Sequence, residues 1–309
     1  MLAALGGFAI IWTIIAVGWL LAQLSILDAH GRVLLNQLAF LVASPALLFS
    51  IVSKASLARL FSNTLIASVG AIAVTAGLYL LANALVFKHS LGGATIGWLV
   101  AAYTNAGNLG LPVAQHVLGD ITWMAPILLV QVAFLQPFAL ASLDAVSARA
   151  RGVRLSTGAA LSLPVRNPIT VGILLGLMVN LTHVTLPAWL GTAVDMVGGM
   201  AVPMMLLAFG VSLRRDPLPG SGPHAREVWL LEALKLVVMP GIALAAGSAL
   251  GLDRHQLLAV GVIAALPTAQ NIYVIASRYG QSVPVARDGV FWSTIGSVPV
   301  ILGLVAFLG

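Results

Sequence analysis

The stretch Asn105-Ala-Gly-Asn-Leu-Gly-Leu-Pro-Val-Ala-Gln115 decides the fold, because it interrupts an apolar segment that otherwise has the length of a membrane helix. Gly107 and Gly110 are unfavourable inside a helix, since glycine loses more backbone freedom on folding than alanine does. Pro112 has no N–H to donate, and its ring clashes with the preceding turn. The sequence therefore predicts a broken membrane helix at this point.

Two asparagines supply polar side chains at the depth of the break. Lipid does not accommodate the amides of Asn105 and Asn108, whereas a cavity lined by protein does. Pro112 is also a favourable first residue for a new helix. We therefore expect a half-helix from Pro112 to Leu118, whose free N–H groups and positive dipole end point into the break.

The same motif returns in the second half of the chain. Leu111–Gln115 (LPVAQ) recurs as Leu266–Gln270 (LPTAQ), and Asn271 follows directly. Interrupted apolar segments at matching positions in two halves of a chain indicate the binding site of a transporter. The sequence thus predicts a break at Pro267 that matches the break at Pro112.

Composition places the chain among integral membrane proteins. Hydrophobic residues make up 60% of the 309 residues and charged residues 8%, and the mean hydropathy is +1.04. The net charge of +6 comes from basic residues in short loops. That pattern reports membrane orientation, so we predict no nucleic-acid partner.

Motifs for catalysis or cofactor binding are absent from the sequence. It contains no Gly-x-Ser-x-Gly elbow, no P-loop, no cysteine and no histidine pair with the spacing of metal ligands. We therefore predict no enzyme activity, no catalytic residue, no metal site and no cofactor.

Charged and turn residues divide the chain into ten apolar segments, each close to the roughly 20 residues that span a bilayer. The predicted fold class is an all-α integral membrane protein with ten transmembrane helices. The segments lie near residues 5–26, 33–52, 63–87, 92–118, 122–146, 167–184, 187–212, 228–250, 256–278 and 286–308.

The basic residues predict the orientation of a multi-pass protein in the cell (inner) membrane. With the N-terminus outside, eleven Lys and Arg residues lie on the cytoplasmic side and three on the outer side, so both termini are predicted to lie outside. Lys235 falls within a span. The cytoplasmic residues are Arg32, Lys88, Arg149, Arg151, Arg154, Arg166, Arg214, Arg215, Arg226, Arg278 and Arg287, and the outer residues are Lys54, Arg59 and Arg254.

A predicted cytoplasmic linker, residues 148–166, divides the chain into two halves of five spans, residues 1–147 and 167–309. An odd number of spans in each half inverts the second half relative to the first. A further internal match joins Pro45 of the second span to Pro203 of the seventh. Two inverted five-helix repeats are typical of secondary transporters.

Short motifs carry a resemblance to a known family. They are Gly110-Leu-Pro112 with Asn105 seven residues before the proline, Ala265-Leu-Pro267, Asn271-Ile-Tyr-Val-Ile-Ala276, Tyr279-Gly280 and Lys235-Leu-Val-Val-Met-Pro240. Over essentially the whole chain, the sequence resembles the auxin efflux carrier family, which includes bacterial carriers for malate and malonate and the plant PIN-type auxin carriers. The wider superfamily, which includes the bile acid:sodium symporters, shares a ten-span inverted-repeat plan.

This resemblance implies a scaffold of spans one, two, six and seven, and a transport domain of spans three to five and eight to ten. The broken fourth and ninth spans would cross within the transport domain. The resemblance also implies a homodimer formed through the scaffold and a role for Asn105 in binding a substrate carboxylate. PIN-type carriers usually have a long regulatory loop between the halves, which the short linker 148–166 does not match.

The two half-helices are expected to begin at the same depth, so that their N-termini face one site and favour an anion there. Asn, Gln and Thr also commonly bond neighbouring membrane helices, and for any one residue we give that alternative equal weight. The predicted substrate-binding residues are Asn105, Asn108, Gly110, Pro112, Pro267, Thr268 and Asn271, and Gln115 and Gln270 are predicted to support the crossing.

Three ionisable residues are candidates for coupling to protons. Glu232 and Lys235 are three residues apart on one helix face and can pair. We favour this structural pairing over proton coupling. Asp195 could carry a proton if it is buried, or it could cap the outer end of its span.

The predicted function is secondary transport of small organic anions, auxin-like or dicarboxylate, across the lipid bilayer by an elevator-like alternating-access movement. The first alternative is a sodium-coupled symporter of the bile acid type, and the scarcity of carboxylates near the breaks counts against it. A second alternative is an intramembrane enzyme or a passive channel. An enzyme would need a Ser/His or paired-Asp constellation at depth, which the sequence does not contain, and a channel would conduct far faster than a carrier.

Overall fold

The computed structural model describes residues 2–54, 62–151, 167–217 and 219–309. Residues 152–166, which make up most of the predicted linker, lie outside the described residues, as do Arg59, Arg154 and Arg166. The described residues form helices and no strand, which confirms the all-α class.

The first half of the chain contains both long continuous helices and short interrupted ones. Several long helices join α-helical parts through turns of π-helix, which are labelled η. The elements are α1 (Leu2–Gln23), α2 (Ala29–Leu38), η1 (Ala39–Ala43), α3 (Ser44–Ser53), α4 (Asn63–Ala82), η3 (Asn83–Phe87), α5 (Leu91–Ala102), η4 (Ala106–Gly110), α6 (Leu111–Val113), η5 (Ala114–Leu118), the 3-10 turn η6 (Ile121–Met124), α7 (Ala125–Val130), η7 (Gln131–Leu135) and α8 (Gln136–Ala150).

The second half is organised in the same way, with two short helices that flank an interruption. Its elements are α10 (Pro168–Thr182), α11 (Ala188–Gly199), α12 (Ala201–Arg215), α13 (Ala225–Ala233), η9 (Leu234–Val238), α14 (Met239–Ala249), α15 (Arg254–Ala265), α16 (Asn271–Tyr279) and α17 (Val283–Leu308).

Six helical segments are long and apolar enough to cross a membrane, judged by length and composition. This finding agrees with a multi-pass membrane protein. The ten-span inverted repeat stays a prediction. The six segments are Ala29–Ser53, Asn63–Phe87, Thr122–Ala150, Ala188–Arg214, Ala225–Ala249 and Val283–Leu308, and the shorter apolar helices are Ala9–Gln23, Leu91–Ala102 and Pro168–Thr182.

Four prolines inside helices follow turns of π-helix, whereas Pro299 lies within α17 without such a turn. The turns η1, η4, η7 and η9 end two residues before Pro45, Pro112, Pro137 and Pro240, respectively. A proline ring clashes with the carbonyl of the residue four positions earlier and removes one ladder hydrogen bond. A wider turn just before the proline separates these groups, so the helix continues without a break.

Glycines bring the backbones of four helices into contact. A Cβ on Gly18 of α1 or on Gly210 of α12 would overlap backbone atoms of the facing helix. The same is true of Gly172 and Gly176 on α10, which lie against the carbonyls of Pro45 and Phe49 in α3. Small residues allow membrane helices to approach closely enough for dispersion contacts to hold them together. These contacts join α1 to α12 and α3 to α10.

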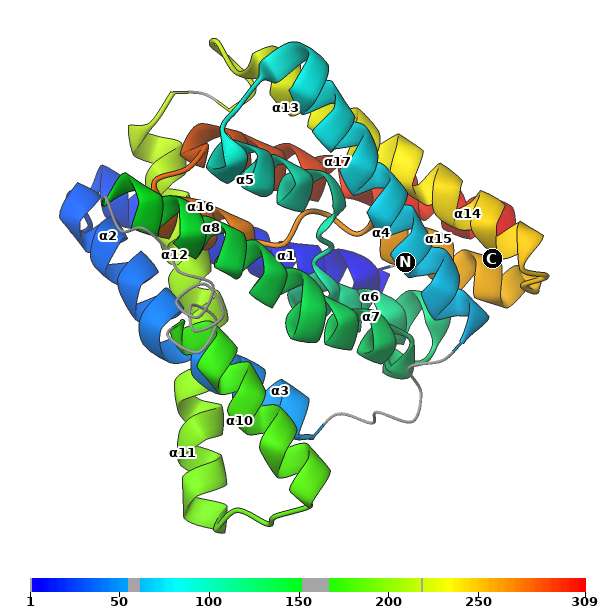
Figure 1. Cartoon of the computed structure of the whole chain (residues 1–309), viewed down its shortest axis with the longest axis horizontal. Helices are drawn as coiled ribbons and strands as arrows, with labels where there is room; N and C mark the ends of the chain where they lie inside the picture. The colour runs from blue at the N-terminus through cyan, green and yellow to red at the C-terminus, as the bar shows by residue number, and fades with distance from the viewer. Residues whose placement is uncertain (1, 55–61, 152–166, 218) are drawn as a thin grey trace.

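A second group of helices lies on the other side of the molecule. In Figure 1, α3, α10 and α11 extend from one side, whereas α4, α14, α15 and α17 lie together opposite them.

An ion-pair cluster connects the ends of α2, α12 and α17. Oδ2 of Asp216 lies 2.8 Å from Nη1 of Arg32 and 3.7 Å from Nη1 of Arg287, and Arg287 also pairs with its neighbour Asp288.

The glycine contacts predict the effect of adding one methyl group. Gly172→Ala should destabilise the protein by about 1–3 kcal/mol, because the new Cβ forces α10 away from the backbone of α3. The measurement is the melting temperature of the purified protein in detergent. Gly191→Ala on α11 is the matched control, since a Cβ at Gly191 meets no atom within 4 Å. Equal melting temperatures for the two variants would contradict this packing.

Candidate functional site

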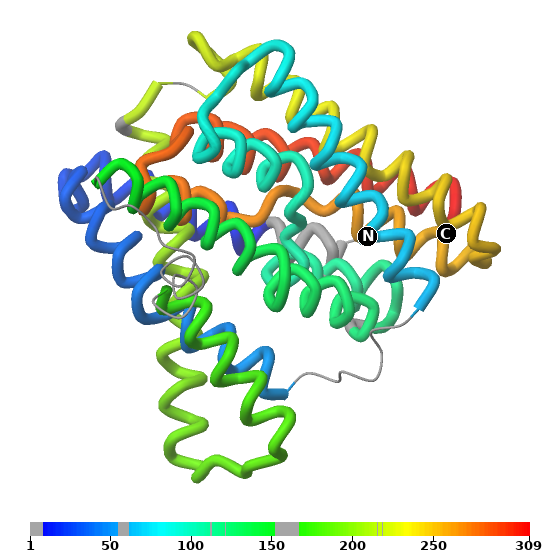
Figure 2. The backbone as a smooth tube through the Cα atoms, viewed as in Figure 1, coloured from blue at the N-terminus to red at the C-terminus, as the bar shows by residue number. Residues whose placement is uncertain are grey.

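Two interrupted helices pair their backbones at the centre of the molecule. Between α5 and η4 the chain is extended at Tyr103–Asn105, and between α15 and α16 it is non-helical at Leu266–Gln270. These segments run antiparallel. The N–H of Asn105 donates to the carbonyl of Pro267 (2.8 Å), and the N–H of Ala269 donates to the carbonyl of Tyr103 (3.3 Å). Figure 2 shows the two uncoiled segments between the helices that they connect.

The first half-helix begins at Ala106, so the expectation that it begins at Pro112 is wrong. Oδ1 of Asn105 accepts hydrogen bonds from the N–H groups of Asn108 (3.2 Å) and Leu109 (3.4 Å), which makes Asn105 the N-cap. Pro112 lies one and a half turns later in the same continuous helix, after the π turn η4. The asparagine cap therefore starts the helix earlier than the proline signal does.

The second half-helix, α16, begins at Asn271 beside the first. The N–H groups of Ile272 and Tyr273 donate to the carbonyls of Ala269 (3.1 Å) and Gln270 (3.1 Å). Both half-helices therefore point their N-termini at the paired segments. Each N-terminus has a partial positive charge, so the region between them favours a negative group.

An amide cluster joins the two interruptions. Oε1 of Gln270 accepts from Nδ2 of Asn105 at 2.7 Å and from Nδ2 of Asn108 at 3.5 Å. Nε2 of Gln270 is buried and has no hydrogen-bond partner. These contacts hold residues from the two halves of the chain together and place three amides at one point.

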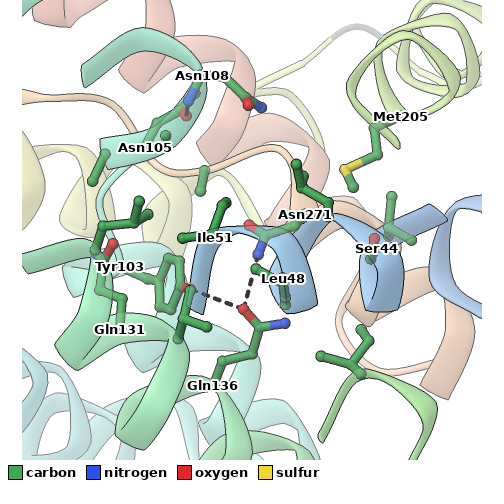
Figure 3. Close-up of a pocket in the computed structure, with 18 of the residues that line it drawn as sticks. Ser44, Leu48, Ile51, Tyr103, Asn105, Asn108, Gln131, Gln136, Met205 and Asn271 are labelled. Carbon is green, nitrogen blue, oxygen red and sulfur yellow. Dashed lines mark hydrogen bonds between the residues drawn. The ribbon is translucent and has the colours of Figure 1, made fainter. Parts of the chain in front are cut away.

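A cavity of about 80 Å³ lies beside the paired segments. Its walls come from both interruptions and from α2–α3, α7–α8, α10 and α12, and Figure 3 shows the side chains that face it. None of the described residues that line it is charged. The polar residues in its lining are Ser44, Tyr103, Thr104, Asn105, Asn108, Gln131, Gln136 and Asn271.

Glutamines of the helix η7–α8 complete the polar wall. Oε1 of Gln136 accepts from the hydroxyl of Tyr103 (2.9 Å) and from Nδ2 of Asn271 (3.4 Å), as the dashed lines in Figure 3 mark. Nε2 of Gln131 donates to Oγ1 of Thr104 at 2.7 Å. Oε1 of Gln131 and Oδ1 of Asn271 are buried without a partner. Buried polar atoms normally have partners, so these two acceptors are open to a ligand.

Sequence reasoning missed Tyr103, Gln131 and Gln136. The two glutamines are polar residues within the apolar segment 122–146, which is a signal that could have singled them out. Because they are distant from the interruptions along the chain, the sequence did not show that they lie beside the interruptions in space. Tyr103 lies directly before the predicted break, but no motif in the sequence singles it out.

The structure brings only some of the predicted substrate-binding residues to the cavity. Asn105, Asn108 and Asn271 line it, whereas Gly110, Pro267 and Thr268 do not. The hydroxyl of Thr268 donates to the carbonyl of Val100 (2.6 Å), and its N–H donates to Oγ of Ser293. Thr268 therefore binds the non-helical segment Leu266–Gln270 to α5 and α17.

Gly110 and the two glutamines of the repeated motif have different surroundings. A Cβ on Gly110 would lie 3.0 Å from Sδ of Met124 and 3.2 Å from the carbonyl oxygen of Asn105, so glycine permits close packing there. Pro112 lies within the first half-helix. Gln270 is buried at the amide cluster, whereas Gln115 is exposed and does not line the cavity.

The three candidates for proton coupling lie outside the cavity. Asp195 is exposed and bonded by Ser50 (2.6 Å) and Lys54 (2.9 Å), as in a surface ion pair. The favoured pairing of Glu232 with Lys235 is not formed within 4 Å. Both carboxyl oxygens of Glu232 are buried without a hydrogen-bond partner.

The cap at Asn105 predicts a cost in stability. Asn105→Ala should destabilise the protein by about 0.5–2 kcal/mol, because the first N–H groups of the half-helix lose their acceptor. Thermal melting in detergent measures this cost. Asn63→Ala on α4 is the control, since Asn63 is exposed and its loss should change stability by no more than about 0.5 kcal/mol. A variant at Asn105 as stable as the control would exclude the capping role.

Comparisons with known proteins identify the family. The model of a family described as "Membrane transport protein" matches residues 4–146 and 142–305. A "Putative malonate transporter" of Rhizobium meliloti is 28% identical over 301 residues, which cover 94% of this chain and 91% of the relative. The "Uncharacterized transporter YfdV" of Escherichia coli K12 is 25% identical over 274 residues, covering 85% of this chain and 84% of the relative.

A plant relative connects the chain to the auxin carriers. The "Auxin efflux carrier component 3a" of rice (Oryza sativa subsp. japonica) is 28% identical over 151 residues, which cover 47% of this chain and 24% of that protein. These matches confirm the resemblance to the auxin efflux carriers, and the family indicates a transporter and not an enzyme. The chain belongs to the family of membrane transport proteins that includes the auxin efflux carriers.

Proposed function

We propose that this protein is a secondary carrier of small carboxylates, in which the cavity beside the paired interruptions binds the anion. The observation that carries this proposal is the meeting of two half-helix N-termini and a cluster of amides at a cavity without charged residues. The N-termini and amide donors suit a carboxylate, whereas the apolar walls contributed by α3, α12 and α16 suit its hydrocarbon part.

Neutral donors are adequate for a monoanion. A helix N-terminus stabilises a negative charge by about 0.3–1 kcal/mol when exposed and by up to about 2 kcal/mol when partly buried. Two such termini, assisted by Asn105, Asn108 and Asn271, would hold the anion without an arginine or lysine. Moderate affinity is useful in a carrier, because the substrate must leave on the other side of the membrane.

The names of the relatives support small carboxylates as the substrate class. One relative is named "Putative malonate transporter" and another "Auxin efflux carrier component 3a". Malonate is a dicarboxylate and auxin is an aromatic monocarboxylate, so the carboxylate group is the part that the two have in common. We propose that the amide cluster and the half-helix termini bind this group.

The arrangement of the helices supports an elevator-like alternating-access movement. The scaffold would comprise α1, α2–α3, α10 and α11–α12, in which glycine contacts join α1 to α12 and join α10 and α11 to α3. The transport domain would comprise the helices that form and surround the two interruptions. Each group would take helices from both of two inverted five-span repeats, in which the interruption after α5 matches the one after α15.

The membrane setting of the proposal follows the basic residues and the family. We propose a multi-pass protein of the cell (inner) membrane with both termini outside. We also propose a homodimer formed through the scaffold, where Trp189 and Met196 of α11 are exposed apolar side chains.

Sodium coupling is a second candidate, favoured by the unpartnered acceptors. Oε1 of Gln131 and Oδ1 of Asn271 are buried carbonyl oxygens, which are ligands that a sodium ion could use. A sodium-coupled symporter would bind its anion only when sodium occupies these oxygens.

Ligand-induced thermal stabilisation tests the proposed function. Malonate, malate and indole-3-acetate should raise the melting temperature of the purified protein, and the uncharged malonamide should not, because the site is built for a negative group. Stabilisation that requires sodium would favour the symporter. A melting temperature that none of the acids changes would overturn the proposal.

A pair of variants that each add one negative charge locates the site. Asn105→Asp keeps an acceptor for the capped N–H groups but puts a negative charge at the cavity, so carboxylate affinity should fall at least about tenfold. Gln115→Glu adds the same charge to the same half-helix at an exposed position outside the cavity, and its affinity should equal that of the wild type. Titration calorimetry measures both affinities, and equal losses would place the site elsewhere.

A further inference from the structure

Two ionisable side chains are buried outside the cavity, on the helix formed by α13, η9 and α14. Glu232 is 6% exposed and Lys235 is fully buried. Nζ of Lys235 donates to the carbonyl of Ala264 at 3.4 Å and lies 3.4 Å from Sδ of Met239. Neither carboxyl oxygen of Glu232 has a hydrogen-bond partner. The anion site described above does not use either group.

This pair contacts the elements that hold the interruptions in place. Ala264 belongs to the last turn of α15, directly before the non-helical segment. Oε1 of Glu232 lies 3.8 Å from the position that a Cβ would take on Gly289 of α17. That position also overlaps Val100 of α5, whose carbonyl accepts from the hydroxyl of Thr268. A change of charge at this pair would therefore take place close to the paired interruptions.

The lysine has two alternative partners. Its ammonium is favourable at the C-terminus of α15, where unpaired carbonyls and the negative end of the helix dipole attract a cation. Glu232 lies three residues earlier on the same helix face, within reach of the same ammonium. A buried carboxylate without a partner is costly, so Glu232 is stable in this arrangement only when a proton neutralises it. Loss of that proton would draw Lys235 from Ala264 towards Glu232.

We propose that Glu232 and Lys235 form a proton-binding site that is loaded together with the anion. The proton adds to a carboxylate oxygen of Glu232 to give a neutral acid, which releases Lys235 to the carbonyl of Ala264. The net charge of Glu232 and Lys235 together changes from zero to plus one beside the paired interruptions. This positive charge attracts the carboxylate in the cavity, so each ligand strengthens the binding of the other. The inference rests on the anion-carrier function proposed above.

The other ionisable groups around Glu232 already have partners. Glu227 of the same helix accepts from the hydroxyl of Tyr79 on α4 (2.7 Å) and pairs with Nε2 of His89 (2.8 Å). Arg287 and Asp288 of α17 pair with each other. α5 and α14 contain no ionisable side chain, and α15 has Arg254 and His255 only in its first turn, at the opposite end from Ala264. Within the described residues, Glu232 is thus the buried carboxyl group whose oxygens have no partner.

Infrared spectroscopy tests the proton directly and needs no substrate. The difference spectrum between the wild type and Glu232→Gln should contain the C=O stretch of a protonated carboxyl group, which disappears as the pH rises. Addition of malonate should raise the pH at which the band disappears. Absence of the band at every pH would overturn the proposal.

The pH dependence of malonate affinity tests the coupling. A single linked proton weakens binding by at most about tenfold for each unit of rising pH, and the wild type should approach this slope. Glu232→Gln resembles the neutral acid, so its affinity should stay high as the pH rises. The same ligand is titrated with both proteins, so the ionisation of malonate itself cancels in the comparison. Melting temperatures confirm that both proteins are folded.

Asp195→Asn is the matched control, because it removes an exposed carboxyl group of α11 that pairs with Lys54 and does not line the cavity. It should keep the pH dependence of the wild type. Retention of that dependence in Glu232→Gln, or its loss in Asp195→Asn, would overturn the proton site. A wild type that binds no carboxylate but has the infrared band would instead overturn the proposed function and with it the coupling.

Discussion

The antiparallel pairing of Tyr103–Asn105 with Pro267–Ala269 is the constraint on which the rest of the structure depends. A backbone that leaves the helix within a membrane exposes N–H and C=O groups that lipid cannot satisfy. Here the two interruptions satisfy each other through the bonds of Asn105 and Ala269. Neither half of the chain can therefore have its interruption without the other half. The helices around them, and the bonds of Thr268 behind them, keep the two segments in register.

This pairing also supports the proposed anion site, which is built from neutral groups. The half-helix termini and the amides are fixed by their bonds to each other, so they are already oriented before an anion arrives. A preorganised site loses little entropy on binding, while the absence of a paired ion limits its affinity. The ionisable groups Glu232 and Lys235 lie outside the cavity. There Nζ of Lys235 donates to the carbonyl of Ala264 at the end of α15.

Much of the fold could be predicted from local signals, whereas the site depended on contacts that are distant in the sequence. Hydropathy indicated the helical segments, and glycine, proline and asparagine pointed to the two segments that the structure interrupts. The start of the first half-helix was misplaced because the Asn105 cap outweighs the Pro112 signal. Helix spacing suggested that Glu232 pairs with Lys235, but the carbonyl of Ala264 on another helix is the partner of the lysine. Gln131 and Gln136 reach the cavity only through tertiary packing.

The π turns before the internal prolines affect how this chain can change by insertion and deletion. Each such turn holds one residue more than an α-helical turn does. Deletion of one residue from η9 would restore α-helical hydrogen bonding, and because the shorter turn completes the same rotation, α13 and α14 would keep their facing relative to each other. Glu232 would then keep its direction relative to the helix that follows. The π turns therefore hold one additional residue each without changing the rotational phase between the two ends of a helix.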